Sequence, residues 1–198
     1  MAKFLLIDNR DSFTYNLKAW VLRGGHECQV LSCDDPIARS QDENWDIAIL
    51  GPGPGTPQEA GWLMDFISLY SDIKPMLGIC LGHQALGFHF GSKLVNAHGP
   101  MFGKRSLLKF SSTMENCMSK SGWRCTSKSQ GLTVMRYHSL ILDQIPPGFE
   151  LLANATDDFS IQAMRHQSKP LWGYQFHPES VLSEQPELLL KIFTDSLK

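Results

Sequence analysis

The chain has 198 residues, 42% of them hydrophobic and 19% charged, with a formal net charge of −2. This length suits one domain that buries a continuous core, so we expect a single domain over residues 1–198. The nearly neutral charge gives no general attraction to nucleic acid or to anionic membranes. We therefore expect neither as a partner.

The cysteines indicate a reducing compartment. There are five, an odd number, scattered along the chain and without a C-x-x-C pair. This pattern argues against a disulfide framework and against a structural zinc site. The apolar run at residues 4–7 is too short for the core of a signal peptide, and no run approaches a membrane span. We expect a cytoplasmic protein.

The first half of the chain alternates short apolar runs with helical periodicity. A strand is predicted at residues 4–7, and a helix follows from Phe13 until Gly24-Gly25 ends it. Further strands are expected at 28–31, 46–50 and 75–79, and a further helix at 60–70. Strands that are apolar on both faces and alternate with helices indicate an α/β fold, with a parallel sheet covered by helices on both faces. Sites in such folds form at the carboxyl ends of the strands.

The second half is richer in strands. They are predicted at 106–110, 132–136, 150–153, 161–165 and 171–176, before a closing helix from about Gln185. This order predicts an antiparallel edge to the sheet. Between Ser111 and Gln130 the composition is rich in Ser, Thr, Lys and Asn, and neither the helical nor the strand period is sustained. We predict a surface loop there.

One cysteine lies in a motif typical of a nucleophile. In Gly78-Ile79-Cys80-Leu81-Gly82, glycines two residues before and after Cys80 allow a sharp turn from strand to helix, with the side chain at a strained, exposed apex. A position at a helix N-terminus favours the thiolate. The alternative is a buried structural cysteine, which is the commoner role of this residue.

A cysteine nucleophile needs a base, and His177 is the best placed of the seven histidines. It follows the strand predicted at 171–176, and Pro178 keeps the next residues out of a helix. At a spacing of two residues in extended chain, His177 and Glu179 point the same way, so the carboxylate can hold the imidazole. The motif predicts a Cys-His-Glu triad. Alternatively, His177 caps a strand and Glu179 begins a helix.

A third motif is the glycine- and proline-rich loop at residues 51–57. Its glycine N–H groups are not obstructed by side chains, which suits the binding of an oxyanion. The N–H groups of Gly53 and of Leu81, the residue after the nucleophile, would form a hole with two donors. The alternative is an ordinary turn. No Lys-Ser or Lys-Thr follows the glycines, so the loop is not a phosphate loop.

These motifs together resemble the class I glutamine amidotransferases. The resemblance rests on residues 78–84, on Phe176-His177-Pro178-Glu179-Ser180 and on the loop at 51–57, and it spans nearly the whole chain. Within the family, residues 5–17 and Arg136-Tyr137-His138-Ser139-Leu140 resemble the glutaminase components of anthranilate synthase and aminodeoxychorismate synthase.

The resemblance implies a flavodoxin-like fold and a thioester mechanism. Cys80 attacks the side-chain amide of L-glutamine, His177 protonates the departing ammonia, and Glu179 orients His177. The ammonia passes to a chorismate-using synthase subunit (component I) in a hetero-oligomer, and neither a metal nor an organic cofactor is implied. The residues implied to contact glutamine are Gly53, Gly55, Gln84, Ser139 and Leu140.

The choice between the two synthases depends on weaker signals. Residues 132–134 and 181–185 favour the aminodeoxychorismate (folate) component over the anthranilate (tryptophan) component, and a chain that serves both is a third option. Arg10, Phe102 and the Ser111 to Gln130 segment depart from the branch pattern, which affects the expected contacts with the partner.

Two hypotheses come from other classes of function. The departures at Phe102 and at 111–130 are also compatible with a catalytically silent module that only binds the partner. A nucleophile turn with a triad serves other thiol hydrolases too, which act on esters or peptides. Only the Gly53 loop and Gln84 favour glutamine over those substrates.

Overall fold

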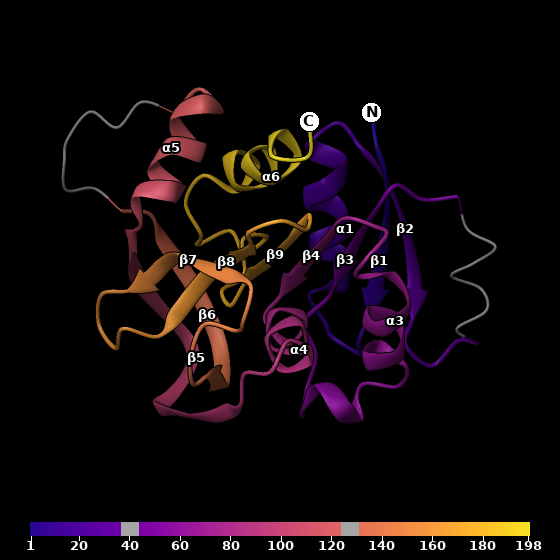
Figure 1. Ribbon diagram of the computed structural model, residues 1–198, viewed down its shortest axis with the longest axis horizontal. Coiled ribbons are helices and arrows are strands. Elements are labelled where there is room, and N and C mark those ends of the chain that lie inside the picture. Colours follow the sequence, from indigo (N-terminus) through magenta and orange to yellow (C-terminus); the bar gives the residue numbers. More distant parts are fainter. Residues whose placement is uncertain (37–43, 124–130) are drawn as a thin grey trace.

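The computed structural model describes residues 1–36, 44–123 and 131–198. In chain order its elements are β1 (Lys3–Asp8), α1 (Thr14–Arg23), β2 (Glu27–Ser32), β3 (Ile47–Leu50), the 3-10 helix η1 (Pro57–Glu59), α3 (Leu63–Tyr70), β4 (Met76–Ile79), α4 (Leu81–His89), β5 (Leu94–Phe110), α5 (Ser112–Lys120), β6 (Thr133–Leu142), β7 (Phe149–Ala155), β8 (Ile161–His166), β9 (Leu171–Tyr174) and α6 (Pro186–Asp195). The strands lie in the order β2-β1-β3-β4-β9-β8-β7-β5-β6 (Figure 1).

The sheet has a parallel part and an antiparallel part. β1 pairs with β2 and β3, β3 with β4, and β4 with β9, all in parallel. From β9 onward the pairs with β8, β7, β5 and β6 are antiparallel. The α/β fold predicted from the sequence is confirmed, and the antiparallel part is wider than the single edge that the strand pattern indicates.

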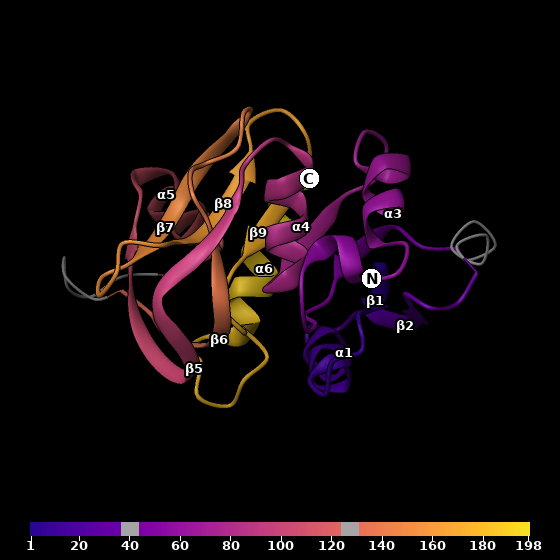
Figure 2. The ribbon, with the colours of Figure 1, turned by 90° about the horizontal axis from the view of Figure 1, so that it is seen from below.

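Helices cover both faces of the sheet. On one face, α1, α5 and α6 bury side chains such as Trp20, Met118 and Phe193 in one apolar cluster. On the other face, α3 and α4 contribute Phe66 and Leu86 to a second cluster. Figures 1 and 2 show these two groups of helices on opposite sides of the strands. Because the central strands are covered on both faces, their residues are apolar on both sides.

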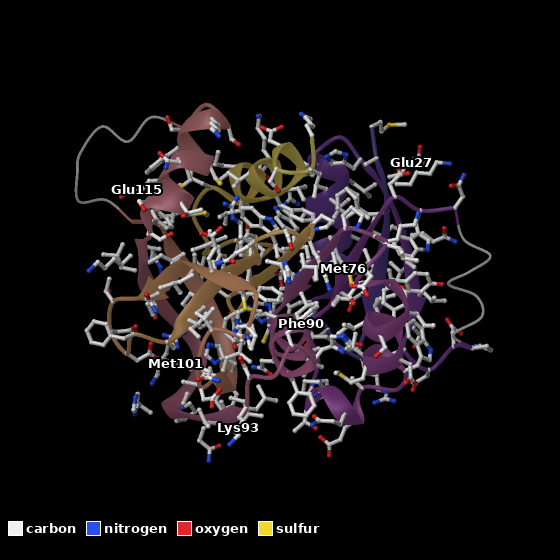
Figure 3. The ribbon with its side chains drawn as sticks, viewed as in Figure 1. Glu27, Met76, Phe90, Lys93, Met101 and Glu115 are labelled. Carbon is white, nitrogen blue, oxygen red and sulfur yellow. The ribbon has the colours of Figure 1, made fainter. Side chains whose placement is uncertain are left out.

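The depth of the core is visible along β4. Met76 is fully buried and lies among the central strands in Figure 3, whereas Glu27 and Glu115 lie at the outline of the molecule.

In the part of the chain that the structure describes, no helix is long and apolar enough to cross a membrane.

The surface loop predicted between Ser111 and Gln130 is wrong for its first half. Residues 112–120 form α5, whose N-terminus is capped by the Ser111 hydroxyl, which accepts a hydrogen bond from the Met114 N–H at 3.3 Å. Met114 and Met118, four residues apart on one helix face, are buried. Two buried methionines, with Cys117 packed beside them, therefore hold a helix whose remaining side chains are polar. Residues 124–130 of the predicted loop lie outside the described residues.

The strand predicted at 106–110 is the end of a much longer one. β5 has 17 residues, and it pairs with β6 through two register shifts, one between Asn96 and Met101 and one between Phe102 and Lys104. Figure 2 shows β5 as a long curved strand. The segment His98-Gly99-Pro100 hides this strand in the sequence, because Gly and Pro are typical of turns.

Candidate active site

Cys80 lies at the turn between β4 and α4, and its backbone is strained. Its φ of 52° and ψ of −101° are unusual for a residue other than glycine. A Cβ on Gly78 would lie 2.4 Å from the Gly82 carbonyl oxygen, and a Cβ on Gly82 would lie 2.1 Å from the Leu50 carbonyl oxygen. Both flanking glycines are therefore required by the close approach of backbone segments, as the motif predicts.

The side chain of Cys80 is less exposed than the motif indicates. Only 5% of the residue is accessible, in place of the exposed apex expected from the sequence. It lies in the wall of a cavity of about 260 Å³. Access to the sulfur therefore depends on this cavity, whose lining is Gly53, Pro54, Gly55, Cys80, Gln84, Phe102, Tyr137, His138, Ser139 and Leu140.

His177 and Glu179 lie just beyond the end of β9 and contact each other. The imidazole Nδ1 is 2.7 Å from the Glu179 carboxylate, and both side chains are buried. The backbone N–H of His177 donates to the backbone carbonyl of Met135 at 2.9 Å, which ties this segment to β6. The His177 Nε2 atom has no hydrogen-bond partner among the described residues. That nitrogen is therefore free to exchange a proton.

The electrostatic setting of His177 favours the imidazolium. Burial by itself would lower the pKa of His177, but the negative charge of an ionised Cys80 and the hydrogen bond and charge of Glu179 raise this pKa well above its ordinary value. The ring also packs against two aromatic side chains, with centroids 5.6 Å from Phe13 and 5.3 Å from Tyr137. These rings limit the access of water to the histidine.

The loop at 51–57 packs against the nucleophile turn. A Cβ on Gly53 would lie 2.8 Å from a methyl carbon of Leu81 and 2.6 Å from the Asn9 carbonyl oxygen, so only glycine fits there. The buried Asn9 side chain donates to the Gly51 carbonyl at 2.8 Å, which holds the start of the loop. The structure thus places Gly53 against Leu81, the residue that follows Cys80.

A buried arginine supports the part of the cavity wall that β6 forms. Arg136 is fully buried, and its guanidinium donates to Asp158 at 2.6 Å and to His138 Nε2 at 3.1 Å. Because His138 Nε2 accepts, Nδ1 carries the proton and donates to the Leu140 carbonyl at 3.0 Å. Burial, together with the charge of Arg136, lowers the pKa of His138 to about 4, so the ring is neutral near pH 7.

Motif reasoning misses several residues of this site. Phe102 lines the cavity although it is 67% exposed, and Gln175 is fully buried beside the sulfur of Cys80. Gln175 directly precedes the Phe176-His177 segment, but nothing in the local pattern points its side chain at a residue 95 positions earlier. Within residues 1–36, 44–123 and 131–198 no group of three or more metal-ligating side chains occurs.

The other cysteines that the structure describes have no comparable setting. Cys28, Cys33 and Cys117 are free thiols, as Cys80 is, and none of the three lines the cavity. Cys125 lies outside the described residues.

Comparison with known proteins shows the family of the chain. The family model described as "Glutamine amidotransferase class-I" matches residues 5–196. The chain therefore belongs to the class I glutamine amidotransferase family.

Its relatives divide between two synthases. The chain is 41% identical to aminodeoxychorismate synthase component 2 of Serratia marcescens, over 96% of this chain and 97% of that protein. It is also 41% identical to anthranilate synthase component 2 of Lactococcus lactis, over 89% of this chain and 86% of that protein. It spans only 32% of the bifunctional protein TrpGD of Thermotoga maritima, to which it is 34% identical.

A solved structure has the same fold. A putative GMP synthase protein from Thermoplasma acidophilum matches with a TM-score of 0.80 and 24% identity, covering 98% of this chain and 93% of that one.

Proposed function

We propose that residues 1–198 form one glutaminase domain that hydrolyses L-glutamine to glutamate and delivers the ammonia to a chorismate-using synthase subunit. The observation that carries this proposal is the strained Cys80 in the wall of a cavity. That cavity is also lined by every residue implied to contact glutamine, namely Gly53, Gly55, Gln84, Ser139 and Leu140. The free thiols and the absence of a C-x-x-C pair support a cytoplasmic location.

In the proposed mechanism the Cys80 thiolate attacks the side-chain amide carbon of glutamine. The N–H groups of Gly53 and Leu81 hold the oxyanion. The C–N bond breaks as His177 gives a proton to the departing ammonia, which leaves a thioester on Cys80. Water then attacks the thioester, and His177 accepts its proton. The C–S bond breaks, glutamate leaves, and the electron pair of that bond returns to Cys80 as the thiolate. Glu179 keeps the imidazole in the required tautomer and stabilises the imidazolium.

We further propose that the recipient is the synthase subunit that makes aminodeoxychorismate. Residues 132–134 and 181–185 favour this component, and the relatives from Serratia marcescens and Escherichia coli with that name are 41% and 39% identical. The second candidate is the anthranilate-forming subunit, which the equally similar Lactococcus lactis relative favours.

Glutamate release from glutamine tests the glutaminase. We expect turnover by the native chain with its synthase partner and at least a hundredfold loss in Cys80→Ser, because an alcohol is a far weaker nucleophile than a thiolate. Cys28→Ser, which alters a free thiol outside the cavity, is the matched control and should retain activity. Turnover that does not need Cys80 would favour another mechanism, and no turnover at all would favour the silent partner-binding module.

The pathway has its own test. Each of the two synthase subunits is mixed with the chain, with glutamine as the only nitrogen source. We expect aminodeoxychorismate to form and the matching subunit to co-purify. Formation of anthranilate alone would overturn the folate assignment, and formation of both products would show that the chain serves both synthases.

A further inference from the structure

A buried glutamine outside the proposed triad contacts the sulfur of Cys80. Gln175 follows β9 directly, is fully buried, and has its Nε2 atom 3.7 Å from Cys80 Sγ. Its own N–H donates to the Gln162 carbonyl at 2.9 Å, which fixes its backbone against β8. The side chain therefore reaches the nucleophile although Gln175 is not a lining residue of the cavity.

The orientation of the Gln175 amide is set by its neighbours. Gln84 Nε2 lies 2.9 Å from the Leu140 carbonyl and 3.2 Å from Gln175 Oε1. An amide nitrogen has two hydrogens and no acceptor capacity, so Gln84 donates one hydrogen to each of these oxygens. Gln175 Oε1 is then the acceptor in this pair, and its Nε2 group must point to the sulfur.

An N–H donor favours one protonation state of its partner. Hydrogen bonds to an ionised acceptor are about twice as strong as those between neutral groups, so the Gln175 amide stabilises a thiolate more than a thiol. Another polar neighbour of the sulfur acts in the opposite sense, since the Tyr137 carbonyl, 4.0 Å away, accepts from S–H. Gln175 thus favours the reactive form, as the imidazolium of His177 also does.

We propose that Gln175 is a further catalytic residue, whose side-chain amide stabilises the Cys80 thiolate. This role rests on the proposed glutaminase function. The amide acts at two points of that reaction. Before attack, it increases the thiolate fraction of the nucleophile. During hydrolysis of the thioester, the C–S bond breaks and its electron pair returns to sulfur, where the same N–H group stabilises the leaving thiolate.

The test is the pH dependence of alkylation of Cys80 by iodoacetamide, followed by mass spectrometry of the peptide that contains Cys80. In Gln175→Met, which keeps an unbranched side chain without the donor, we expect roughly tenfold slower alkylation at pH 7. The pH of half-maximal rate should move up by about one unit, while the rates at high pH converge, because every thiol is then ionised. A purely structural role would lower the plateau and leave the midpoint in place.

Gln162→Met is the matched control. Gln162 is also fully buried, but its side chain donates to Ser160 Oγ at 2.8 Å rather than to Cys80. We expect its alkylation midpoint to equal that of the native chain. If Gln175→Met does not fold, Gln175→Glu serves instead, because it keeps an acceptor for Gln84 and replaces the donor by a carboxylate. Its midpoint should move up further.

An unchanged midpoint in a folded Gln175 variant would overturn the inference. Alkylation does not use glutamine, so the result is separable from the proposed function. A shifted midpoint without Cys80-dependent glutamate release would overturn the function and keep Gln175 as a thiolate donor. Cys80-dependent glutamate release without a shift of the midpoint would keep the proposed function and overturn the role of Gln175.

Discussion

The parallel and antiparallel parts of the sheet hold the two sides of the site in different ways. Beside β4, the turn at Cys80 depends on backbone segments so close that a Cβ on Gly82 would lie 2.1 Å from the Leu50 carbonyl oxygen. Beside β6, the wall of the cavity depends on Arg136, which is fully buried and bonded to Asp158 and His138. One side is fixed by steric fit and the other by polar pairing.

The two sides should therefore tolerate different perturbations. Steric fit of the backbone fails when volume is added, because the carbonyl of a neighbouring strand cannot move aside. Polar pairing fails when one partner is removed, because the remaining group is left buried without a partner. We therefore expect the turn at Cys80 to be disturbed by added side-chain volume. We expect the wall formed by β6 to be disturbed by the loss of a charged side chain.

The largest expected effect is on the polar side. Arg136→Leu leaves the Asp158 carboxylate, which is largely inaccessible, without its ion-pair partner, so the free energy of unfolding should fall by about 3–5 kcal/mol. Urea denaturation measures this change. Arg23→Leu is the control, because the Arg23 and Glu187 side chains, 3.1 Å apart, are about half exposed, and its loss should be under about 1 kcal/mol. An equal fall in the free energy of unfolding in the two variants would contradict the claim that the ion pairs of Arg136 hold this wall.

The next effect is on the steric side. Gly82→Ala should reduce glutamine turnover by roughly a hundredfold, because the added methyl displaces the turn that carries Cys80. Gly99→Ala is the matched control, since a Cβ there meets nothing within 4 Å and its backbone does not have a positive φ. The measurement is steady-state glutamate release. Native turnover in Gly82→Ala would show that the turn relaxes without cost to the nucleophile.

The smallest effect, counted per pH unit and per side chain, comes from one buried histidine on each side. Burial lowers the pKa of His83, in α4, to about 3, and burial with the charge of Arg136 lowers that of His138, in β6, to about 4. Below about pH 6.5 the unfolded chain protonates both rings while the folded chain keeps them neutral. Unfolding therefore takes up protons, and stability falls as the pH falls from 6.5 towards 4, by about 1.4 kcal/mol per pH unit for each histidine.

Urea unfolding at several pH values separates the two contributions. His83→Met should remove about half of this histidine-dependent slope. His177 has a raised pKa, so it is protonated in both states below about pH 6.5 and adds no slope there; its stabilisation is lost only as the pH rises through its folded pKa. A slope unchanged by His83→Met would show that His83 takes up no proton on unfolding.

Local motifs make much of the parallel side predictable from the sequence. The turn at Cys80 can be predicted from the five residues 78–82, because they include both flanking glycines. The contact between His177 and Glu179 can be predicted from their spacing within three residues. The assignment of these residues as a catalytic triad stays a prediction until activity is measured.

The antiparallel side is harder to predict because its contacts join distant segments. Arg136 meets Ser106, 30 positions away, only after β5 and β6 pair. It also meets Asp158, 22 positions away, which lies in the turn between β7 and β8. In the same way α5 escapes prediction, because Met114 and Met118 indicate a helix only when a sheet lies beneath them. Local periodicity carries no information on such pairings.

The central claim is that Cys80 is the nucleophile that attacks glutamine. It is tested most directly with a glutamine analogue in which a chloromethyl ketone replaces the carboxamide, followed by mass spectrometry of the peptides. We predict one adduct, on Cys80, whose formation is slowed by glutamine and is absent in Cys80→Ser. An adduct on another cysteine, or labelling of Cys80 that glutamine does not slow, would contradict the claim.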